Sequence, residues 1–335
     1  MSKMLVTGGL GYIGSHTVVE LLQLGESVVV VDNLANTTKD VIQRIQKITG
    51  KTFSYYNVDV CDTPALESVF DTEAITSVIH FAAYKAVGES VEKPVAYYHN
   101  NLTGLISLLH CVKKYKVSSL VFSSSCTVYG DTKESPITES HPIVDAISPY
   151  GTTKIIGEAI LSDFTKYCHT KVVCLRYFNP VGAHESALIG ELPLGVPSNL
   201  IPYVTQTAAG VREKLTIFGN DYNTPDGTNI RDFIHVVDLA NAHVKAVIFA
   251  RNNDFSIDIF NLGTGVGHSV LEVVEAFERV NNLTLNYTFG PRRQGDVEQI
   301  WADAGKAKTI LGWETVLDLD EMMRSAWAWQ QTLKT

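Results

Sequence analysis

Short apolar runs alternate with longer segments of helical periodicity through the first half of the chain. Six runs predict strands, at residues 4–6, 27–32, 53–59, 77–82, 119–125 and 171–177. Between them, residues 15–24, 64–70, 94–115 and 150–167 repeat apolar side chains at helical spacing. Valine-rich strands separated by helices are typical of a parallel sheet covered on both faces. The pattern therefore predicts an α/β fold built on a doubly wound sheet.

The rhythm changes after Phe178. Residues 179–199 are rich in Gly and Pro, which predicts loops that leave the sheet. Beyond them we expect a strand at 215–218 and helices at 200–211, 236–250, 270–281 and 319–332. We predict a first domain of residues 1–178 and a smaller mixed α/β domain of residues 179–335 over the carboxyl edge of the sheet, with some later segments returning to the first domain. The length of 335 residues also favours two domains.

Composition excludes several classes of function. The formal net charge is −9, whereas proteins that bind nucleic acid or anionic lipid do so through clustered Lys and Arg. No stretch has the ~20 apolar residues that span a bilayer, and we expect neither a signal peptide nor a membrane segment. The five cysteines are scattered and form no C-x-x-C pair. We therefore expect no disulfide framework, no metal site and a reducing, cytoplasmic location.

The segment TGGLGYIG, residues 7–14, follows the first predicted strand and opens the first predicted helix. Its glycines, Gly8, Gly11 and Gly14 among them, let the backbone approach a pyrophosphate held at the helix N-terminus. Asp32 ends the next strand, where a carboxylate would accept hydrogen bonds from an adenosine ribose and repel a 2′-phosphate. NAD is therefore favoured over NADP as the cofactor. A structural glycine turn and an aspartate that caps a turn are the alternatives.

Further cofactor candidates lie in the same loop or at the ends of neighbouring strands. Ligands of doubly wound sheets bind at the carboxyl ends of the strands, so these positions face the expected site. They are Tyr12, Ile13, Asn33, Asn36, Asp59, Val60, Phe81, Ala82 and Lys85.

The segment SPYGTTK, residues 148–154, contains the candidate chemistry. On a helix, Tyr150 and Lys154 are neighbours on one face, so an ammonium group approaches a phenol. Positive charge from Lys154 and from the nicotinamide ring of NAD⁺ would favour the phenolate, which makes the tyrosine a general base. Ser123, Ser124 and Ser125 follow the fifth strand at the same edge, where a serine hydroxyl can share a hydrogen bond with a substrate hydroxyl and Tyr150. A solvated helix face and a strand-end turn are the structural alternatives.

Several longer segments are similar to one known family. TGGLGYIG, HFAAYKAVGESVEKP, FSSSCTVYGD, SPYGTTK, LRYFNPVGAH, IFGNDYNTPDGTNIRDFIHV, NLGTGVGHSV and PRRQGDVEQIWAD together resemble the UDP-glucose 4-epimerase family of extended short-chain dehydrogenases/reductases. The resemblance extends nearly from end to end, and the last four segments are the most specific. It implies a Rossmann-type sheet with a smaller C-terminal domain that binds the UDP-sugar.

The resemblance also implies a reaction. In this family a resident NAD⁺ takes hydride from sugar C4 while a tyrosine, here Tyr150, removes the proton of the 4-hydroxyl. The 4-keto sugar turns, and hydride returns to its opposite face. Ser125 would bridge the 4-oxygen and the tyrosine, and Lys154 would hold the nicotinamide ribose and lower the pKa of Tyr150. Ser123, Asn100 and Phe178 would lie near the cofactor.

A sugar that turns must be held by its nucleotide, and the resemblance assigns this grip. Arg231 and Arg293 suit a diphosphate because a guanidinium donates paired hydrogen bonds. Each arginine alone is more often a surface ion-pair partner. The other substrate-binding residues that the resemblance implies are Lys85, Ala86, Val87, Asn179, Asn199, Leu200, Thr216, Ile217, Phe218 and the run from Arg293 to Asp296.

Ile300 departs from members of the family that have a bulky tyrosine before the corresponding tryptophan. The smaller side chain leads to the hypothesis that the N-acetylated UDP-sugar pair is also a substrate.

One alternative is a sugar-nucleotide 4,6-dehydratase or decarboxylase of the same fold, although Cys126 and Thr127 stand where dehydratases have carboxylates. Another is a non-catalytic NAD-binding regulator, although the chain retains Tyr150 and Lys154. The resemblance further predicts a homodimer, with residues 94–115 and 150–167 at the interface.

Overall fold

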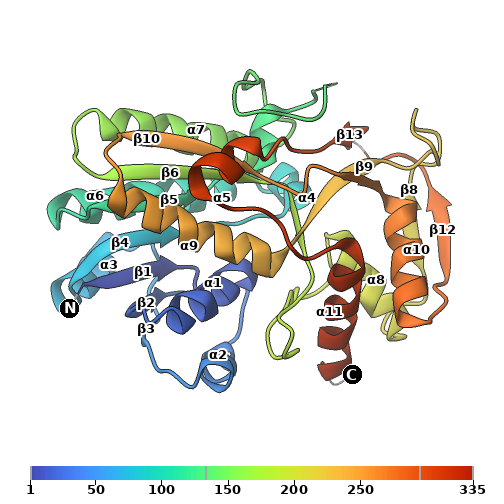
Figure 1. Cartoon of the computed structure of the whole chain (residues 1–335), viewed down its shortest axis with the longest axis horizontal. Helices are drawn as coiled ribbons and strands as arrows, with labels where there is room; N and C mark the ends of the chain where they lie inside the picture. The colour runs from blue at the N-terminus through green and yellow to red at the C-terminus, as the bar shows by residue number, and fades with distance from the viewer. Residues whose placement is uncertain (1, 133, 294–295, 334–335) are drawn as a thin grey trace.

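A seven-stranded parallel sheet organises the larger part of the molecule (Figure 1). The computed structural model describes residues 2–132, 134–293 and 296–333. The strand order is β10-β6-β5-β4-β1-β2-β3, so the order reverses between β1 and β4. The strands are β1 Lys3–Thr7, β2 Val28–Val31, β3 Ser54–Tyr56, β4 Ile75–His80, β5 Ser119–Ser123, β6 Lys171–Tyr177 and β10 Ile257–Leu262. Such a reversal opens a crevice at the carboxyl ends of the strands.

Alternate residues of each central strand enter two different hydrophobic cores. Met4 and Val6 of β1 pack on one face of the sheet, and Leu5 packs on the other. The first face is covered by α1 (Tyr12–Gln23), α2 (Val41–Thr49) and α9 (Val236–Asn252). The second is covered by α3 (Thr63–Thr72), α6 (Gly104–Lys114) and α7 (Pro149–Thr165). Burial on both faces explains why these strands are runs of valine rather than alternating sequences.

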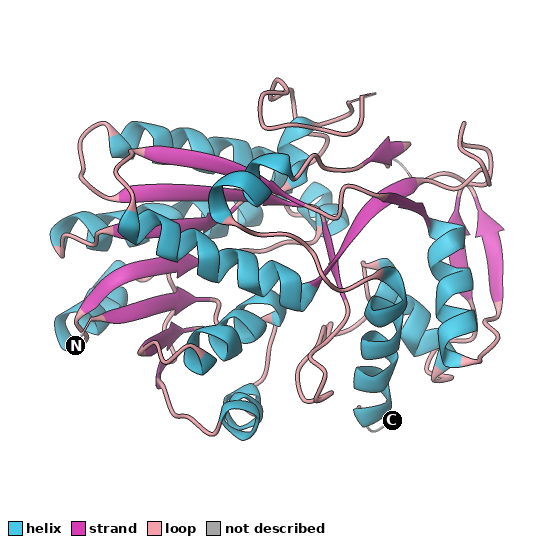
Figure 2. Cartoon of the chain, viewed as in Figure 1, coloured by secondary structure: helices cyan, strands magenta, loops and turns pink. Residues whose placement is uncertain are grey.

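The smaller part has a separate core and lies beside the carboxyl edge of the sheet (Figures 1 and 2). β9 (Ile230–His235) pairs with β7 (Asn179–Val181), β11 (Gly267–Ser269) and β13 (Gln299–Ile300). β8 (Leu215–Phe218) pairs with β12 (Tyr287–Gly290). The helices α8 (Leu200–Ala208), α10 (Val270–Asn281) and α11 (Leu319–Thr332) pack against these strands. Their contacts bury side chains such as Phe233, Phe277 and Met323.

The doubly wound α/β fold predicted from the sequence is confirmed, and several boundaries differ. α1 begins at Tyr12 rather than residue 15, because Gly11 caps it in an extended conformation. The predicted helix 94–115 is α5 (Pro94–Tyr98) and α6 joined by the π-helical turn η1 (His99–Thr103). The predicted strand 53–59 is only β3, and the predicted helix 200–211 ends at Ala208.

Several short elements have no clear signal in the sequence. They are α2, α4 (Val87–Glu92), the 3₁₀ turn η2 (Cys126–Tyr129), η3 (Ala307–Leu311), β7 and β9 to β13. β10 comes from the second half of the chain and pairs with β6 at the edge of the large sheet. Among the described residues, no helix is both long and apolar enough to cross a membrane.

Candidate active site

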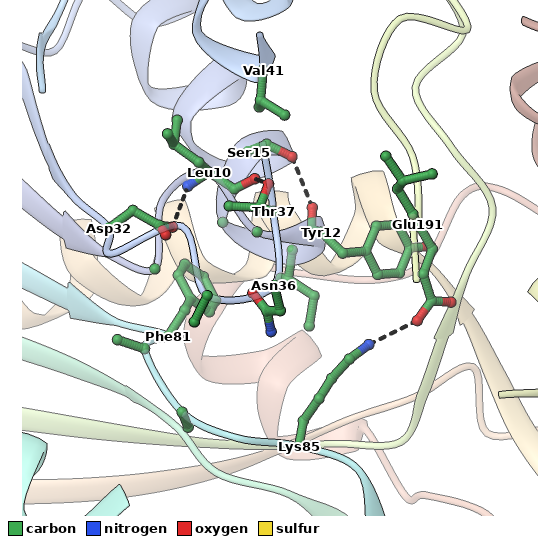
Figure 3. Close-up of a pocket in the computed structure, with 18 of the residues that line it drawn as sticks. Leu10, Tyr12, Ser15, Asp32, Asn36, Thr37, Val41, Phe81, Lys85 and Glu191 are labelled. Carbon is green, nitrogen blue, oxygen red and sulfur yellow. Dashed lines mark hydrogen bonds and ion pairs between the residues drawn. The ribbon is translucent and has the colours of Figure 1, made fainter. Parts of the chain in front are cut away.

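One pocket lies at the carboxyl ends of β1, β2, β4, β5 and β6, where the sheet reverses its order. Figure 3 shows Asp32, Asn36, Phe81 and Lys85 around it. Sixteen of the eighteen predicted cofactor residues line its wall: Gly8, Gly11, Tyr12, Ile13, Gly14, Asp32, Asn33, Asn36, Val60, Phe81, Ala82, Lys85, Asn100, Ser123, Tyr150 and Lys154. The two exceptions are Asp59, which accepts a hydrogen bond from Asn33 (3.0 Å), and Phe178.

The glycine loop folds back on itself so tightly that Gly8 and Gly14 have no room for a side chain. A Cβ on Gly14 would lie 2.2 Å from the carbonyl oxygen of Gly8. Gly8 has φ +69°, and a Cβ there would lie 2.8 Å from the amide nitrogen of Ala82. The Thr37 hydroxyl donates to the Leu10 carbonyl (2.7 Å) and holds the loop from the side of β2. The backbone is thus exposed to a ligand at the N-terminus of α1, as a pyrophosphate requires.

Asp32 joins this loop to the end of β2. Its carboxylate accepts hydrogen bonds from the amides of Leu10 (3.0 Å) and Leu34 (2.9 Å), as Figure 3 shows for Leu10. Burial raises the pKa of Asp32, and these backbone hydrogen bonds oppose that shift. A carboxylate oxygen has further acceptor capacity, so the group can hold the loop and bind a ribose hydroxyl. These residues fit a dinucleotide with an unphosphorylated adenosine ribose.

Tyr150 and Lys154 lie in the first two turns of α7. Ser148 caps this helix by accepting a hydrogen bond from the amide of Gly151 (3.2 Å), and Pro149 occupies its first turn. The Lys154 ammonium donates to the carbonyl of Ser123 (2.6 Å) and lies 5.6 Å from the centroid of the Tyr150 ring. Burial lowers the pKa of Lys154 to about 8. The predicted pairing of a cation with the phenol is therefore present.

The three serines after β5 have three different partners. The hydroxyl of Ser123 is hydrogen-bonded to that of Tyr177, and Ser124 donates to Glu158 (2.5 Å). Ser125 caps the turn η2 by accepting from the amide of Thr127 (3.2 Å). Burial raises the pKa of Tyr150 well above its ordinary value, and the nearby Ser125 hydroxyl opposes that shift. Lys154 by itself therefore does not make Tyr150 a base, and a second positive charge is needed beside the phenol.

A second group of predicted residues gathers around β9. Arg231 lies beside Ile300 in the register of β9 and β13, and Asn179 reaches the same strand through β7. Burial lowers the pKa of Arg231, and its guanidinium donates to the Ile230 carbonyl (2.8 Å). Across the described ranges Arg231 forms no ion pair. A half-buried cation without a carboxylate partner is suited to an anionic ligand.

The remaining substrate candidates are more dispersed. Arg293 and Asp296 form an ion pair with each other (2.7 Å), and Gln294 and Gly295 of the predicted run lie outside the described residues. Phe218 is 43% exposed, whereas Ile217 is buried in the smaller core. Asn199 lines the cofactor pocket. The other members lie at or near the ends of α4, α8 and β8: Ala86, Val87, Leu200 and Thr216.

The structure adds pocket residues that the sequence did not indicate. Residues 188–194, 197 and 198 form part of the wall, next to the predicted Asn199. Glu191 accepts hydrogen bonds from Lys85 (2.7 Å) and Asn199 (2.7 Å), and Figure 3 shows its contact with Lys85. The indole of Trp329 in α11 donates to the Glu191 carbonyl (3.0 Å). The Gly- and Pro-rich composition of 179–199 indicated a loop, but nothing in it indicated which partners hold the loop in place.

Comparison with known proteins gives a consistent result. Residues 5–326 match the family model described as GDP-mannose 4,6 dehydratase. The UDP-glucose 4-epimerase of Bacillus subtilis is 53% identical over 98% of this chain and 97% of its own length. The Stenotrophomonas maltophila UDP-glucose-4-epimerase with bound NAD and formylated UDP-arabinopyranose has a TM-score of 0.96 at 47% identity, covering 99% of this chain and 98% of that one. The Bifidobacterium longum UDP-glucose 4-epimerase in complex with NAD⁺ and UDP has a TM-score of 0.95 at 47% identity, covering 99% of both chains.

Proposed function

The chain belongs to the UDP-glucose 4-epimerase family, and we propose that it interconverts UDP-glucose and UDP-galactose with NAD as its resident cofactor. The observation that carries this proposal is the meeting of Tyr150 and Lys154 at the wall of the glycine-loop pocket, beside the strand end that leads from Ser123 of the same wall to Ser125. A base and a hydroxyl placed there can act on the oxygen of a substrate whose adjacent carbon faces a dinucleotide. Bound NAD⁺ would supply a reversible hydride acceptor and a positive charge.

Tyr150 is assigned the proton transfer. Its phenol would remove the proton from the sugar 4-hydroxyl and return a proton after the 4-keto sugar has turned. Burial alone raises the pKa of Tyr150, so the phenolate needs positive charge close to it. Lys154 supplies one charge, and it remains ammonium only below its own pKa of about 8. Ser125 would hold the sugar oxygen within reach of the tyrosine.

The nucleotide grip is assigned to the group around β9. Arg231 is half-buried and without an ion pair among the described residues, so a diphosphate would find a guanidinium that no carboxylate already occupies. Asn199 and the Arg293–Asp296 pair would complete the contacts with the nucleotide. Holding the nucleotide leaves the hexose free to present either face.

The family model also includes dehydratases, and η2 argues against that reaction here. Elimination of water needs an added acid and base, and Cys126 and Thr127 stand in the turn that begins after Ser125. Burial raises the pKa of Cys126 to about 12, so the thiol does not serve as an acid or base near neutral pH. A regulator without catalysis would have no need of the buried Lys154.

A second candidate substrate is the UDP-N-acetylglucosamine and UDP-N-acetylgalactosamine pair. Ile300 is buried in an apolar cluster with Cys126 and Phe178. In the chain, Cys126 directly follows Ser125, and Phe178 directly precedes Asn179. The isoleucine side chain is smaller than the tyrosine that some members of the family have in its place. The extra volume favours acceptance of a 2-acetamido group.

Further proposals concern organisation. We propose an NAD-binding domain of residues 1–178 with α9 and β10 added, and a UDP-sugar domain formed by the rest of 179–335. We also propose a homodimer through α5, α6 and α7, because Val95 is 79% and Ile106 55% exposed on the first two of these helices. A cytoplasmic location fits the scattered cysteines.

The test is to incubate the purified protein, without added NAD, with UDP-galactose and separately with UDP-N-acetylgalactosamine, and to identify the products. The proposal expects UDP-glucose from the first incubation and UDP-N-acetylglucosamine from the second. Absence of UDP-glucose, after NAD has been shown in the protein, would overturn the function. Absence of UDP-N-acetylglucosamine alone would overturn only the second candidate. Loss of water from the sugar would indicate a dehydratase.

A further inference from the structure

Glu158 continues the line of Tyr150 and Lys154 along α7. The three residues are spaced four apart, so they share one face of the helix. Glu158 is 5% exposed, and it does not line the cofactor pocket. A fully buried carboxylate is costly unless it is paired, so its partners indicate its role.

The partners of Glu158 lie at the end of β5 and in β6, the strands next to α7. Its carboxylate accepts from the Ser124 hydroxyl (2.5 Å) at the end of β5. Arg176 of β6 binds it through two nitrogens, at 2.6 and 2.9 Å. Arg176 also donates to the hydroxyl of Tyr129 in η2 (3.0 Å), which in turn donates to Asn261 of β10 (2.6 Å). The network thus ties α7 to three strands and to the turn that begins after Ser125 (Figure 1).

Ser124 lies between two residues of the site. The Ser123 carbonyl accepts a hydrogen bond from the Lys154 ammonium, and the Ser125 hydroxyl lies close enough to Tyr150 to act on the pKa of its phenol. Anchoring Ser124 to Glu158 therefore fixes both neighbours relative to α7.

Glu158 also acts on Lys154 through its charge. Burial lowers the pKa of Lys154, and the negative charge of Glu158 is the contribution that raises it. Among the described residues, Tyr150 on the same helix and His80 on β4 are the other titratable groups beside Lys154, and Tyr177 on β6 lies behind the hydroxyl of Ser123, to which it is hydrogen-bonded. Burial and the Lys154 charge lower the pKa of His80 to about 3, and burial raises that of Tyr177 to about 12. His80 and Tyr177 are neutral near pH 7, so they cannot hold the ammonium in its charged form.

We propose that Glu158 is a positioning residue of the epimerisation, which keeps Lys154 charged and, through Ser124, holds Ser125 against Tyr150. The proposal rests on the function proposed above. It predicts that the alkaline limb of kcat against pH follows the charge at residue 158, because Tyr150 loses its supporting cation when Lys154 deprotonates.

The experiment measures kcat and KM for UDP-galactose from pH 6 to 10 in wild type, Glu158→Gln, Glu158→Asp and Ser124→Ala. In Glu158→Gln the alkaline limb moves to lower pH by about one unit, because one charge of a close pair is lost. KM changes little, because residue 158 does not touch the substrate. Glu158→Asp keeps the charge and the wild-type limb, at a lower kcat. Ser124→Ala lowers kcat at every pH and leaves the limb unmoved.

Glu158→Gln leaves the buried Arg176 without its counter-charge, so thermal unfolding and NAD content are measured for each variant. If Glu158→Gln does not fold, Arg176→Gln is measured instead, and the shift of the alkaline limb is expected in the opposite direction. It leaves Lys154 as the cation nearest to Glu158, and the limb moves to higher pH.

An unmoved limb in a folded Glu158→Gln, or equal shifts in Glu158→Gln and Glu158→Asp, would overturn the role of Glu158. Failure of the wild type to turn over UDP-galactose would instead overturn the proposed function, so the two failures are distinguishable.

Discussion

The ammonium nitrogen of Lys154 lies 5.6 Å from the centroid of the Tyr150 ring, and both side chains are at least nine-tenths buried. Burial acts on the two groups in the same sense, because it disfavours the charged form of each. It raises the pKa of Tyr150 and lowers that of Lys154 to about 8. The pair is therefore ready for proton transfer only when further positive charge lies against the phenol.

Replacing Tyr150 by Phe removes the base and leaves the fold of α7 intact. Turnover of UDP-galactose should fall by about 10²- to 10⁴-fold, the usual contribution of a general base. NAD measured after denaturation should remain near the wild-type amount, because the glycine loop and Asp32 are unchanged. Tyr167→Phe is the matched control, since that side chain is 84% exposed beyond the end of the same helix. Equal activity of the two variants would contradict the assignment.

Gly14→Ala should abolish retention of the cofactor. The added Cβ would lie 2.2 Å from the Gly8 carbonyl oxygen, so the loop must open where a pyrophosphate would bind. Gly88→Ala, in α4, is the control, because a Cβ there meets nothing within 4 Å. The NAD content of the purified proteins checks this. A Gly14→Ala protein that keeps its NAD would show that the loop does not hold the cofactor.

Acidification should destabilise the protein before its carboxylates titrate. Burial lowers the pKa of His16 and His80 to about 3, and of His235 and His243 to about 4. Between these values and the ordinary ~6.5, the unfolded chain binds more protons than the folded one. The free energy of unfolding therefore falls as the pH drops below 6.5, by about 1.4 kcal/mol for each histidine and pH unit.

Urea unfolding between pH 7.5 and 5.5 measures this slope. His243→Gln should reduce the slope by the contribution of one histidine, about 1.4 kcal/mol per pH unit. A wild-type stability that does not change over this range would refute the prediction.

Ile300→Tyr should narrow the substrate range. The larger ring would enter the cluster that contains Cys126 and Phe178 and take the volume needed by a 2-acetamido group. The ratio of kcat/KM for UDP-N-acetylgalactosamine to that for UDP-galactose should fall by at least about 10-fold, the effect of a misfitted group in a pocket. Ile300→Leu keeps the volume and should keep the ratio. If Ile300→Tyr leaves the ratio of kcat/KM values unchanged, the acetamido group does not bind beside residue 300.

The amino-acid sequence alone determined six of the seven strands of the large sheet and led to the proposed reacting residues. Valine runs at strand length and the period of the helices are local properties, so they indicate a doubly wound fold without knowledge of contacts. The glycines at 8, 11 and 14, Asp32, and the spacing of Tyr150 and Lys154 are also local, because each feature lies within one loop or one helix turn. The family resemblance then joined them into one site.

Only the tertiary structure decided the partners that meet across the chain. Glu158 binds Ser124 and Arg176, and Glu191 binds Lys85 and Asn199, although no spacing in the sequence links these residues. The same holds for β10, which completes the large sheet from the second half of the chain. Burial likewise depends on what surrounds a group. For that reason the pKa of Tyr150 is raised in the folded chain although its lysine neighbour, read from the sequence, predicted the opposite.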